Sequence, residues 1–249
     1  MATTRDLVNK VLRGLRQFGL IIDSGTTSIS DEYLLMILQF VNEAKEEIEE
    51  SGWSWRALRT TVTVTTSAST AEYDLTIAGA ADVDTNDRSR LLYEIGGGSE
   101  SFTRTTSSLP QAFDVTDSSE FRLTEVSQEK MERWHFTDDN ETEARPQYFT
   151  WYNDGDSIKI KLWPTPSESR TLKFRFHNPQ TELLDSDLDT VLSIPFRPVW
   201  TKALWKANQE RGDELGAQGS TLHMAYLDAH GAAAGAEMTP ADLTVSMEQ

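Results

Sequence analysis

The feature that most constrains this chain is the stretch from Asp31 to Trp55, where apolar residues recur every three or four positions. That spacing places them on one face of an α-helix. The apolar face comprises Leu34, Ile37, Leu38, Val41, Ala44 and Ile48. The opposite face is polar and mostly acidic, with Asn42, Glu43, Glu46, Glu47, Glu49 and Glu50. We expect a long helix, capped by Ser30 and ended by Gly52, that is either a plain core helix or one whose acidic face meets a neighbouring subunit.

A second amphipathic helix is predicted over residues 3–19, with Thr4 as its N-cap and Gly19 at its end. Its apolar face comprises Leu7, Val8, Val11, Leu12, Leu15 and Phe18. Off that face lie three residues that form one of the few basic patches in the chain: Lys10, Arg13 and Arg16. Because a loop, Ile21–Ser30, joins the two helices, we expect them to pack as an antiparallel hairpin.

Beyond Trp53 the apolar residues alternate with polar ones, which is typical of β-strands. Strands are predicted over 60–66, 73–75, 90–95, 121–126, 148–152, 157–163 and 171–177. Asp154-Gly155 suits a hairpin turn, and the last three strands are therefore expected to form an antiparallel meander. A short helix is predicted over 127–134, and the polar stretch 99–113 is predicted to be a long excursion from the sheet.

Two further helices are predicted after the strands, one ending near Gly212 and one from Ala217 that fades through Gly231–Gly235. The order of elements predicts an α+β fold, in which an N-terminal helix hairpin and C-terminal helices form a helical bundle and an antiparallel β-sheet or sandwich domain is inserted between them. The predicted parts are a helical domain of residues 1–55 and 195–238, a β-rich domain of residues 56–194, and an extended C-terminal tail of residues 239–249. In that tail Leu243, Val245 and Met247 alternate with polar residues, so the tail either dangles or adds a strand to a partner.

Composition excludes several classes of function. The 249 residues include 23 basic and 40 acidic side chains, and the formal net charge of −17 argues against binding nucleic acid by neutralising phosphates. The acidic surface serves either solubility or a channel wall past which a polyanion slides. The chain has no cysteine, which removes disulfides and thiolate chemistry. No apolar run approaches the ~18 residues of a membrane span, so no membrane partner is predicted.

The sequence contains no pattern that predicts catalysis or metal binding. The stretches that begin at Asp82 and Asp185 resemble calcium loops, but both lack the glycine and the glutamate that such loops need at positions six and twelve. None of the four histidines forms an i, i+4 ligand pair, and each is expected to be structural or at the surface: His135, His177, His223 and His230. We therefore predict that the protein is not an enzyme and binds no cofactor or metal.

Aromatic residues in the predicted meander allow a different function. Tyr148, Trp151, Tyr152 and Trp163 could line a face that stacks on sugars or bases. Aromatic residues in alternating strands are more often part of a core or of a subunit interface. A protein that binds a carbohydrate or receptor, or that attaches fibres, through this aromatic sheet is therefore the alternative to an assembly component.

The order of several short motifs resembles that of one protein family. Ser51-Gly52-Trp53-Ser54-Trp55 ends the first helix pair, and Arg145-Pro146-Gln147-Tyr148-Phe149 begins the hairpin. The remaining motifs are residues 154–160, the stretch Leu162-Trp163-Pro164-Thr165-Pro166, and Ala203-Leu204-Trp205-Lys206-Ala207. This order is similar to that of the head-to-tail adaptor (connector) proteins of tailed bacteriophages, especially the tail tubular protein A group. Ala144 stands where that pattern leads us to expect glycine.

The resemblance implies a structural protein at the head-tail junction of a virion. In that family twelve copies form a ring between the portal and the tail nozzle or tube, tail fibres are possible further partners, and DNA passes through without sequence recognition. On this basis we expect Glu43, Glu46 and Glu50 to meet Lys10, Arg13 and Arg16 of a neighbouring subunit. The resemblance also implies a C-terminal extension that reaches the portal, and we expect Leu243, Val245 and Met247 to dock there.

Overall fold

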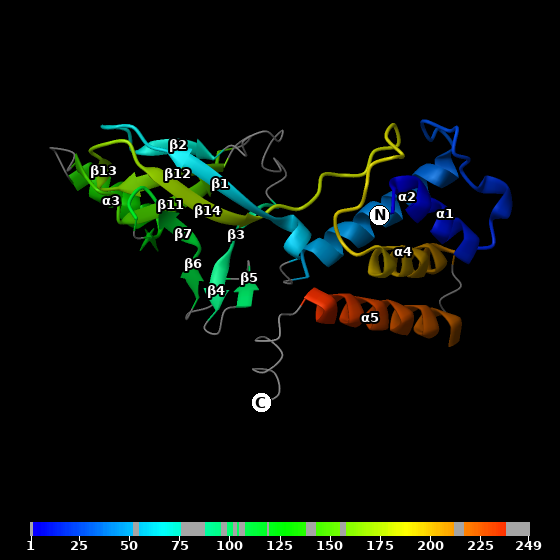
Figure 1. Ribbon diagram of the computed structural model, residues 1–249. Coiled ribbons are helices and arrows are strands. Elements are labelled where there is room, and N and C mark those ends of the chain that lie inside the picture. The colour runs from blue at the N-terminus through cyan, green and yellow to red at the C-terminus, as the bar shows by residue number, and fades with distance from the viewer. Residues whose placement is uncertain are drawn as a thin grey trace, which may run out of the picture. The chain divides into compact units, whose positions relative to one another are not determined.

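The fold is mixed α+β, with helices near both ends of the chain and strands between them, which confirms the predicted fold class (Figure 1). The computed structural model describes residues 2–51, 55–75, 88–95, 99–101, 104, 108–118, 120–137, 143–154, 158–211 and 217–237. The chain divides into two compact units. One combines Met1–Leu58 with Gln180–Gln249, and the other is Arg59–Pro179.

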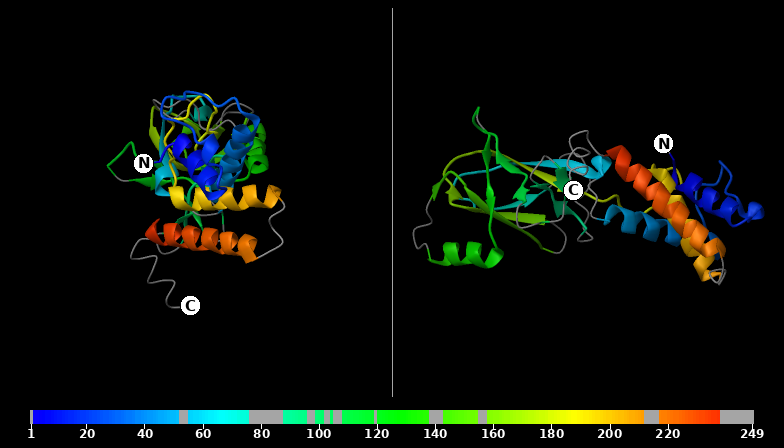
Figure 2. Two further views of the ribbon diagram at one scale, coloured as in Figure 1. Left: turned by 90° about the vertical axis from the view of Figure 1, so that its right-hand side faces the viewer. Right: turned by 90° about the horizontal axis from the view of Figure 1, so that it is seen from below.

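The first unit is helical and is built around α4. Its helices are α1 (Thr4–Gly14), α2 (Glu32–Glu49), α4 (Phe196–Glu210) and α5 (Ala217–Glu237), with short 3-10 turns η1 (Phe18–Leu20) and η2 (Arg56–Leu58). The helix α4 contacts the other three helices, and α5 lies beside it on the side away from α1 and α2 (Figures 1 and 2). The predicted apolar faces of α1 and α2 meet in one core, in which Leu7, Val11, Ile37, Val41 and Ile48 are fully buried.

The first helix begins and ends earlier than the sequence suggested. Thr3, and not Thr4, is its N-cap, and Thr3 and Asp6 form a reciprocal capping box. The helix ends at Gly14 because Arg16 adopts φ 60°, the left-handed conformation that closes a Schellman motif. The Gln17 N–H donates to the Leu12 carbonyl at 2.9 Å, and the Arg16 N–H donates to the Arg13 carbonyl at 3.1 Å. The prediction that the helix ends at Gly19 was therefore wrong.

The second helix begins after Asp31, whose carboxylate accepts from the backbone N–H groups of Tyr33 and Leu34. Asp31 therefore takes the capping position that we assigned to Ser30. Asn42 and Glu49, which we placed on the exposed face, are instead buried. Gly52 and Trp53 lie outside the described residues.

The segment that leads from the strands back to the helices packs in the helical unit. Leu183, Leu188, Leu192 and Ile194 are buried in the same core as α1 and α2. The predicted β-rich part included residues 180–194, because the acidic and hydroxyl residues between those apolar side chains are typical of a linker. The helix α5 continues through Gly231 and Gly235 to Glu237, beyond the point where its pattern fades.

The second unit contains two main sheets whose side chains share one core. One sheet has the order β1 (Arg59–Thr65), β14 (Thr171–His177), β7 (Ala112–Asp114) and β8 (Phe121–Arg122), with β3 (Arg90–Leu91) also paired to β14. The other has the order β2 (Glu72–Leu75), β12 (Ile158–Trp163), β11 (Tyr148–Asn153) and β9 (Thr124–Glu125). Phe149 of the second sheet packs against Phe174 of the first, with ring centres 5.4 Å apart.

Smaller elements complete this unit. They are the helix α3 (Gln128–Thr137), the three-stranded sheet of β5 (Ser99–Ser101), β4 (Tyr93–Ile95) and β6 (Leu109–Pro110), and the parallel pair of β10 (Glu143–Ala144) and β13 (Thr165–Pro166). The predicted excursion over 99–113 therefore contains β5, β6 and part of β7. Within it, residues 102–103 and 105–107 lie outside the described part of the chain.

The predicted meander over 148–177 is wrong in its last strand. The hairpin of β11 and β12 is present, with Tyr148 opposite Trp163, but β14 pairs with β1 in the other sheet, with Phe174 opposite Val62. Pro164 and Pro166 have no N–H to donate, so the β12 ladder cannot continue through them. The chain crosses to the other sheet at this point, and β14 completes the pairing of a strand more than a hundred residues earlier.

Candidate functional site

Basic residues gather on the exposed side of α1. Lys10, Arg13 and Arg16 are all exposed, whereas the opposite side of the helix is buried. The Lys10 ammonium lies 5.5 Å from the centre of the Trp200 ring of α4, which is cation–π distance. Among the described residues, Arg13 and Arg16 form no ion pair. The basic patch is thus a local excess of positive charge on a strongly acidic chain.

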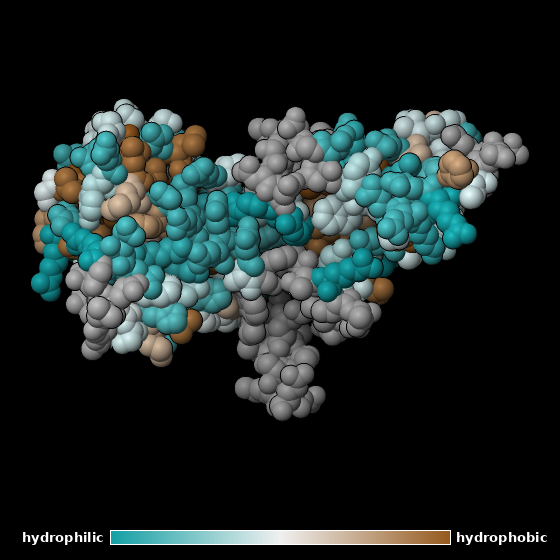
Figure 3. Space-filling view, turned by 180° about the vertical axis from the view of Figure 1, so that it is seen from behind, coloured by the Kyte–Doolittle hydropathy of each residue, from teal (hydrophilic) through white to brown (hydrophobic). Residues whose placement is uncertain are grey.

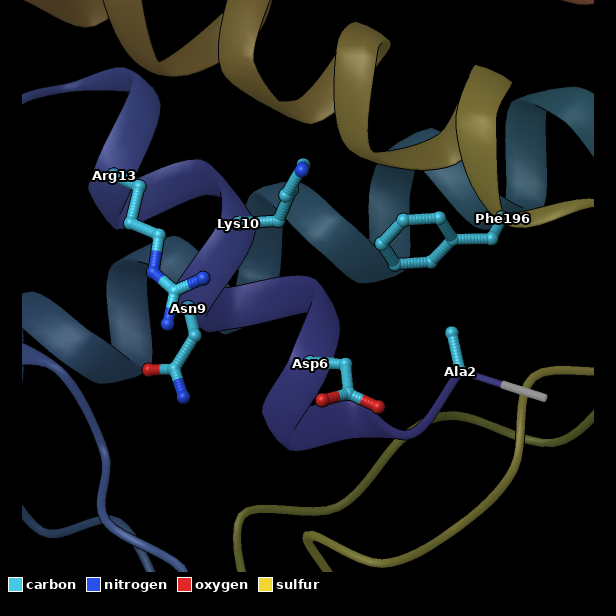
Figure 4. A pocket seen from close by; sticks show the side chains of 6 residues that line it. All are labelled: Ala2, Asp6, Asn9, Lys10, Arg13 and Phe196. Carbon is cyan, nitrogen blue, oxygen red and sulfur yellow. The ribbon is translucent and has the colours of Figure 1, made fainter.

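A shallow pocket lies beside the basic patch, between α1 and the start of α4. It is lined by Ala2, Asp6, Asn9, Lys10, Arg13 and Phe196. Figure 4 shows Phe196 reaching from α4 toward α1, with Lys10 extending on the α4 side of its own helix. Asp6 already accepts from the Thr3 backbone N–H at 3.0 Å and from the Thr3 hydroxyl at 3.1 Å. The pocket therefore carries two cations, Lys10 and Arg13, against one carboxylate, which already serves as the helix cap.

The acidic face of α2 is partly neutralised within the helical unit. The Lys206 ammonium of α4 lies 2.9 Å from the Glu43 carboxylate and 2.5 Å from that of Glu47, and the Lys202 ammonium lies 2.6 Å from Glu47. Burial alone would raise the pKa of Glu47, but the hydrogen bonds from Lys202 and Lys206 outweigh it and hold this pKa below its usual value. The pKa of Lys206 is raised in turn, because its bonds to Glu47 and Glu43 outweigh desolvation. These pairs join α2 to α4.

The residues predicted for a subunit interface lie on two helices. Lys10 and Arg13 are on α1 and Arg16 follows its end, whereas Glu43 and Glu46 are half-buried on α2 and Glu50 is its exposed C-cap. Glu43 has a partner in its own chain, Lys206. The contact of these six residues with another subunit stays a prediction. The residues predicted for portal docking, Leu243, Val245 and Met247, lie outside the described residues.

The aromatic residues of β11 and β12 pack against α3 and into the core. The Trp134 ring of α3 lies 5.1 Å from that of Tyr148 and 5.9 Å from that of Trp163. Trp151 points to the other side, where its ring meets that of Phe176 at 6.2 Å. These residues are therefore divided between two faces of the sheet, and α3 covers one of the faces. The arrangement does not favour a stacking surface for sugars or bases.

A buried network of charged side chains, which the sequence did not predict, explains the Arg145-Pro146 motif. Asp114 is fully buried and accepts from the Arg145 guanidinium at 2.8 Å and from that of Arg170 at 3.0 Å. Burial would raise the pKa of Asp114, but hydrogen bonds from Thr116 and the charges of both arginines hold it below its usual value. Arg145 also lies 4.6 Å from the centre of the Phe121 ring. The Arg-Pro pair that begins the hairpin motif thus fixes the β-rich unit internally.

The described part of the chain contains no group of three or more His, Cys, Asp or Glu side chains placed to hold a metal ion. Three histidines lie beside aromatic rings: His135 is 5.1 Å from Trp163, His223 is 4.6 Å from Trp205, and His230 meets Trp55 edge-on at 5.9 Å. Among the described helices, none is long and apolar enough to cross a membrane. Figure 3 shows a face that is hydrophilic over most of its area, with hydrophobic residues in separate small groups.

Comparison with known proteins identifies the family. The model of the SU10 adaptor protein family matches residues 2–245, nearly the whole chain. No curated protein matches the sequence closely enough to be informative. The family match confirms the predicted resemblance to bacteriophage head-to-tail adaptors, which are structural components of the virion. This chain belongs to the SU10 adaptor protein family.

Proposed function

We propose that this protein is a head-to-tail adaptor that forms a ring, twelvefold in symmetry, between the portal and the tail nozzle or tube. The ring surrounds a channel through which DNA passes, and the protein performs no catalysis. The match of the family model over residues 2–245 carries this proposal. Self-association into a closed ring requires that two different surfaces of the same subunit be complementary.

The charges of the helical unit supply such a pair of surfaces. The exposed Arg13 and Arg16 carry positive charge at one end of α1, and the exposed Glu50 carries negative charge at the end of α2. A head-to-tail contact places the basic patch of one subunit against the acidic end of α2 in the next. The formal charge of −17 supports passage of DNA, because an acidic channel wall repels a polyanion and gives it no place to bind.

Different parts of the chain are proposed to bind different partners. Leu243, Val245 and Met247 of the C-terminal segment dock on the portal, since alternating apolar residues suit strand addition or an apolar groove. The nozzle and the fibres contact other surfaces of the adaptor.

Native mass spectrometry and negative-stain imaging test the ring. We expect the chain to add to purified portal as a closed ring of twelve copies. A protein that stays monomeric, both alone and with portal, contradicts the proposal.

A charge exchange tests the interface. Arg16→Glu should reduce ring formation on the portal several-fold, and adding Glu50→Lys should restore it. Arg197→Glu, at an exposed position of α4, is the matched control and should leave assembly unchanged. Equal assembly by Arg16→Glu and the unmodified chain would remove the basic patch from the interface.

A further inference from the structure

An apolar groove on the helical unit begins where α5 ends. Glu237, the last residue of α5, lines this groove together with Ala2, Ala57 and the segment Val191–Phe196. Its position is fixed, because its carboxylate accepts from the Arg56 backbone N–H at 3.2 Å and its carbonyl accepts from the Arg56 guanidinium at 3.0 Å. The chain therefore leaves α5 from a defined point at the groove itself.

The basic pocket described above adjoins this groove along α1. Ala2 and Phe196 line both hollows, whose volumes are about 530 and 470 Å³. The first part is mostly apolar, and Val191 within it is 42% exposed. The far part ends at the exposed cations Lys10 and Arg13 (Figure 4). The two adjoining hollows, together called the groove below, are thus apolar near Glu237 and positive at the other end.

The segment that follows Glu237 has matching chemistry. In residues 238–249, Leu243, Val245 and Met247 alternate with polar residues, so an extended conformation places the three apolar side chains on one face. The segment contains no basic residue, and its acidic residues are Asp242 and Glu248. From these features we propose that the groove binds residues 238–249 of the same chain, with the apolar side chains near Val191 and an acidic side chain near Lys10 and Arg13.

The length of the segment permits this path. An extended chain spans about 3.3 Å per residue, so Glu248 can lie up to about 36 Å from Glu237. The helical stretch from Thr4 to Arg13 rises about 1.5 Å per residue, or about 14 Å. Because Ala2 and Glu237 line the same hollow, the segment can cross that hollow and still reach Arg13.

This inference deepens the proposed function, because the same three apolar residues are those proposed to dock on the portal. Binding to the portal then requires that the segment leave its own groove. The groove therefore acts as a competitor that keeps apolar residues covered before assembly. The test uses the isolated chain without portal, so its failure leaves the ring and the portal contact untouched.

The cysteine-free sequence allows a direct test by disulfide trapping in the full-length chain. We expect Val191→Cys with Val245→Cys to form a disulfide within one chain under mild oxidation, seen as a faster-migrating monomer on a non-reducing gel. The matched control pairs Val245→Cys with Met224→Cys, at an exposed position of α5 that does not line the groove. This control should form at least several-fold less intrachain disulfide.

Charge reversal tests the far end of the groove. Lys10→Glu with Arg13→Glu should lower the yield of the Val191–Val245 disulfide several-fold, and adding Asp242→Lys with Glu248→Lys should restore it. Arg197→Glu is the control for the loss of a cation elsewhere on the helical unit, and it should leave the yield of this disulfide unchanged. Equal yields from the test and control cysteine pairs overturn the proposal, and so do disulfides that form only between chains.

Discussion

Arg16 holds a backbone conformation that most L-residues avoid. A left-handed conformation brings Cβ close to the following carbonyl oxygen, and glycine usually takes this place after a helix. Both hydrogen bonds of the Schellman motif are nevertheless present, and the Arg211 guanidinium also donates to the Leu15 carbonyl at 3.4 Å. Arg16 belongs to the exposed basic patch, so this strained position carries a positive charge that glycine would lack.

We predict that Arg16→Gly stabilises the helical unit by up to about 1 kcal/mol. Relief of the left-handed strain, about 1–2 kcal/mol, exceeds the entropy that glycine adds to the unfolded chain, about 0.4–1 kcal/mol. Urea unfolding followed by circular dichroism measures the change. Arg13→Gly removes the same charge from the last turn of α1 and should instead destabilise by about 1 kcal/mol. Equal losses for both variants would contradict this account.

His177 makes the β-rich unit sensitive to pH. It ends β14 and is 1% exposed, and burial together with the nearby charges of Arg88, Arg59 and Arg90 lowers its pKa from 6.5 to about 4. The folded state therefore holds this histidine neutral at a pH where the unfolded chain already binds a proton. Its contribution to stability is complete above pH 6.5 and decreases as the pH falls toward about 4.

We predict that acidification from pH 7 to 4.5 lowers the free energy of unfolding by roughly 2–3 kcal/mol through His177 alone, since one pKa unit corresponds to about 1.4 kcal/mol. His177→Gln does not titrate, so its unfolding free energy should change less over this range. Urea titrations at pH 7, 6, 5 and 4.5, followed by tryptophan fluorescence, compare how the unfolding free energies of the two proteins depend on pH. Parallel slopes would assign the pH dependence to other groups.

At the scale of elements, buried polar side chains of α2 attach the returning chain to the helical unit. The Lys45 ammonium donates to the Gln180 carbonyl at 2.6 Å and lies 3.3 Å from the Glu49 carboxylate, which accepts from the Gln180 N–H at 3.2 Å. Asn42 donates to the Leu183 carbonyl at 3.0 Å and accepts from its N–H at 2.9 Å. These hydrogen bonds from side chains of α2 hold the backbone of segment 180–183 against the helix, although the segment has no regular secondary structure.

We predict that Lys45→Met destabilises the helical unit by about 3–5 kcal/mol, because it leaves the fully buried Glu49 without its cation. The double variant Lys45→Met with Glu49→Gln should recover at least half of that loss, since the glutamine is neutral and still offers an oxygen to Gln180. Glu210→Gln, at an exposed position of α4 in the same unit, should change stability by less than about 0.5 kcal/mol. Chemical denaturation measures all of these variants. Additive losses in the double variant would show that Lys45 and Glu49 do not act as a pair.

The sequence predicts those elements that show a periodic pattern of apolar residues or whose contacts are between residues close in the chain. The apolar faces of α1 and α2, the hairpin of β11 and β12 and the α+β order follow from spacings of three to four or two residues, and the structure contains each of them. Features that depend on distant residues were missed. The helical pattern alone places Lys45 and Glu49 toward solvent, and only the contact with the distant Gln180 shows that they are buried. Likewise, the alternation of β14 does not reveal that it pairs with β1 and not with β12.

In the candidate site, too, local features could be predicted from the sequence and contacts between distant residues could not. The basic patch could be predicted in part, because Lys10 and Arg13 follow from the helical period of α1, whereas Arg16 lies beyond the end of the helix. The intrachain partner of Glu43 could not, because Lys206 lies more than 160 residues away and only the packing of α4 on α2 brings the two together. The groove along Val191–Phe196 could not be predicted either, since the composition of residues 180–194 is typical of a linker.

At the scale of the whole molecule, two electrostatic effects oppose each other in the proposed ring. Contacts between the basic patch and acidic residues of a neighbour attract, and salt weakens them. The formal charge of −17 on every copy repels all other copies, and salt weakens this repulsion as well. Repulsion acts over the whole surface, whereas the attraction involves three basic residues, so repulsion dominates at low ionic strength.

We therefore predict that rings on the portal form more completely at about 0.3 M salt than at about 0.02 M, where the screening length exceeds 20 Å. Asp185→Asn with Asp187→Asn changes the formal charge from −17 to −15 at two exposed positions, and should shift the transition to lower salt. Mass photometry across a salt series follows both proteins, with Thr181→Ser as an uncharged control. If assembly instead weakens steadily as salt rises, the specific attraction of the basic patch exceeds the general repulsion. The acidic surface would then hold the subunits together through the basic patch, in addition to any effect on passing DNA.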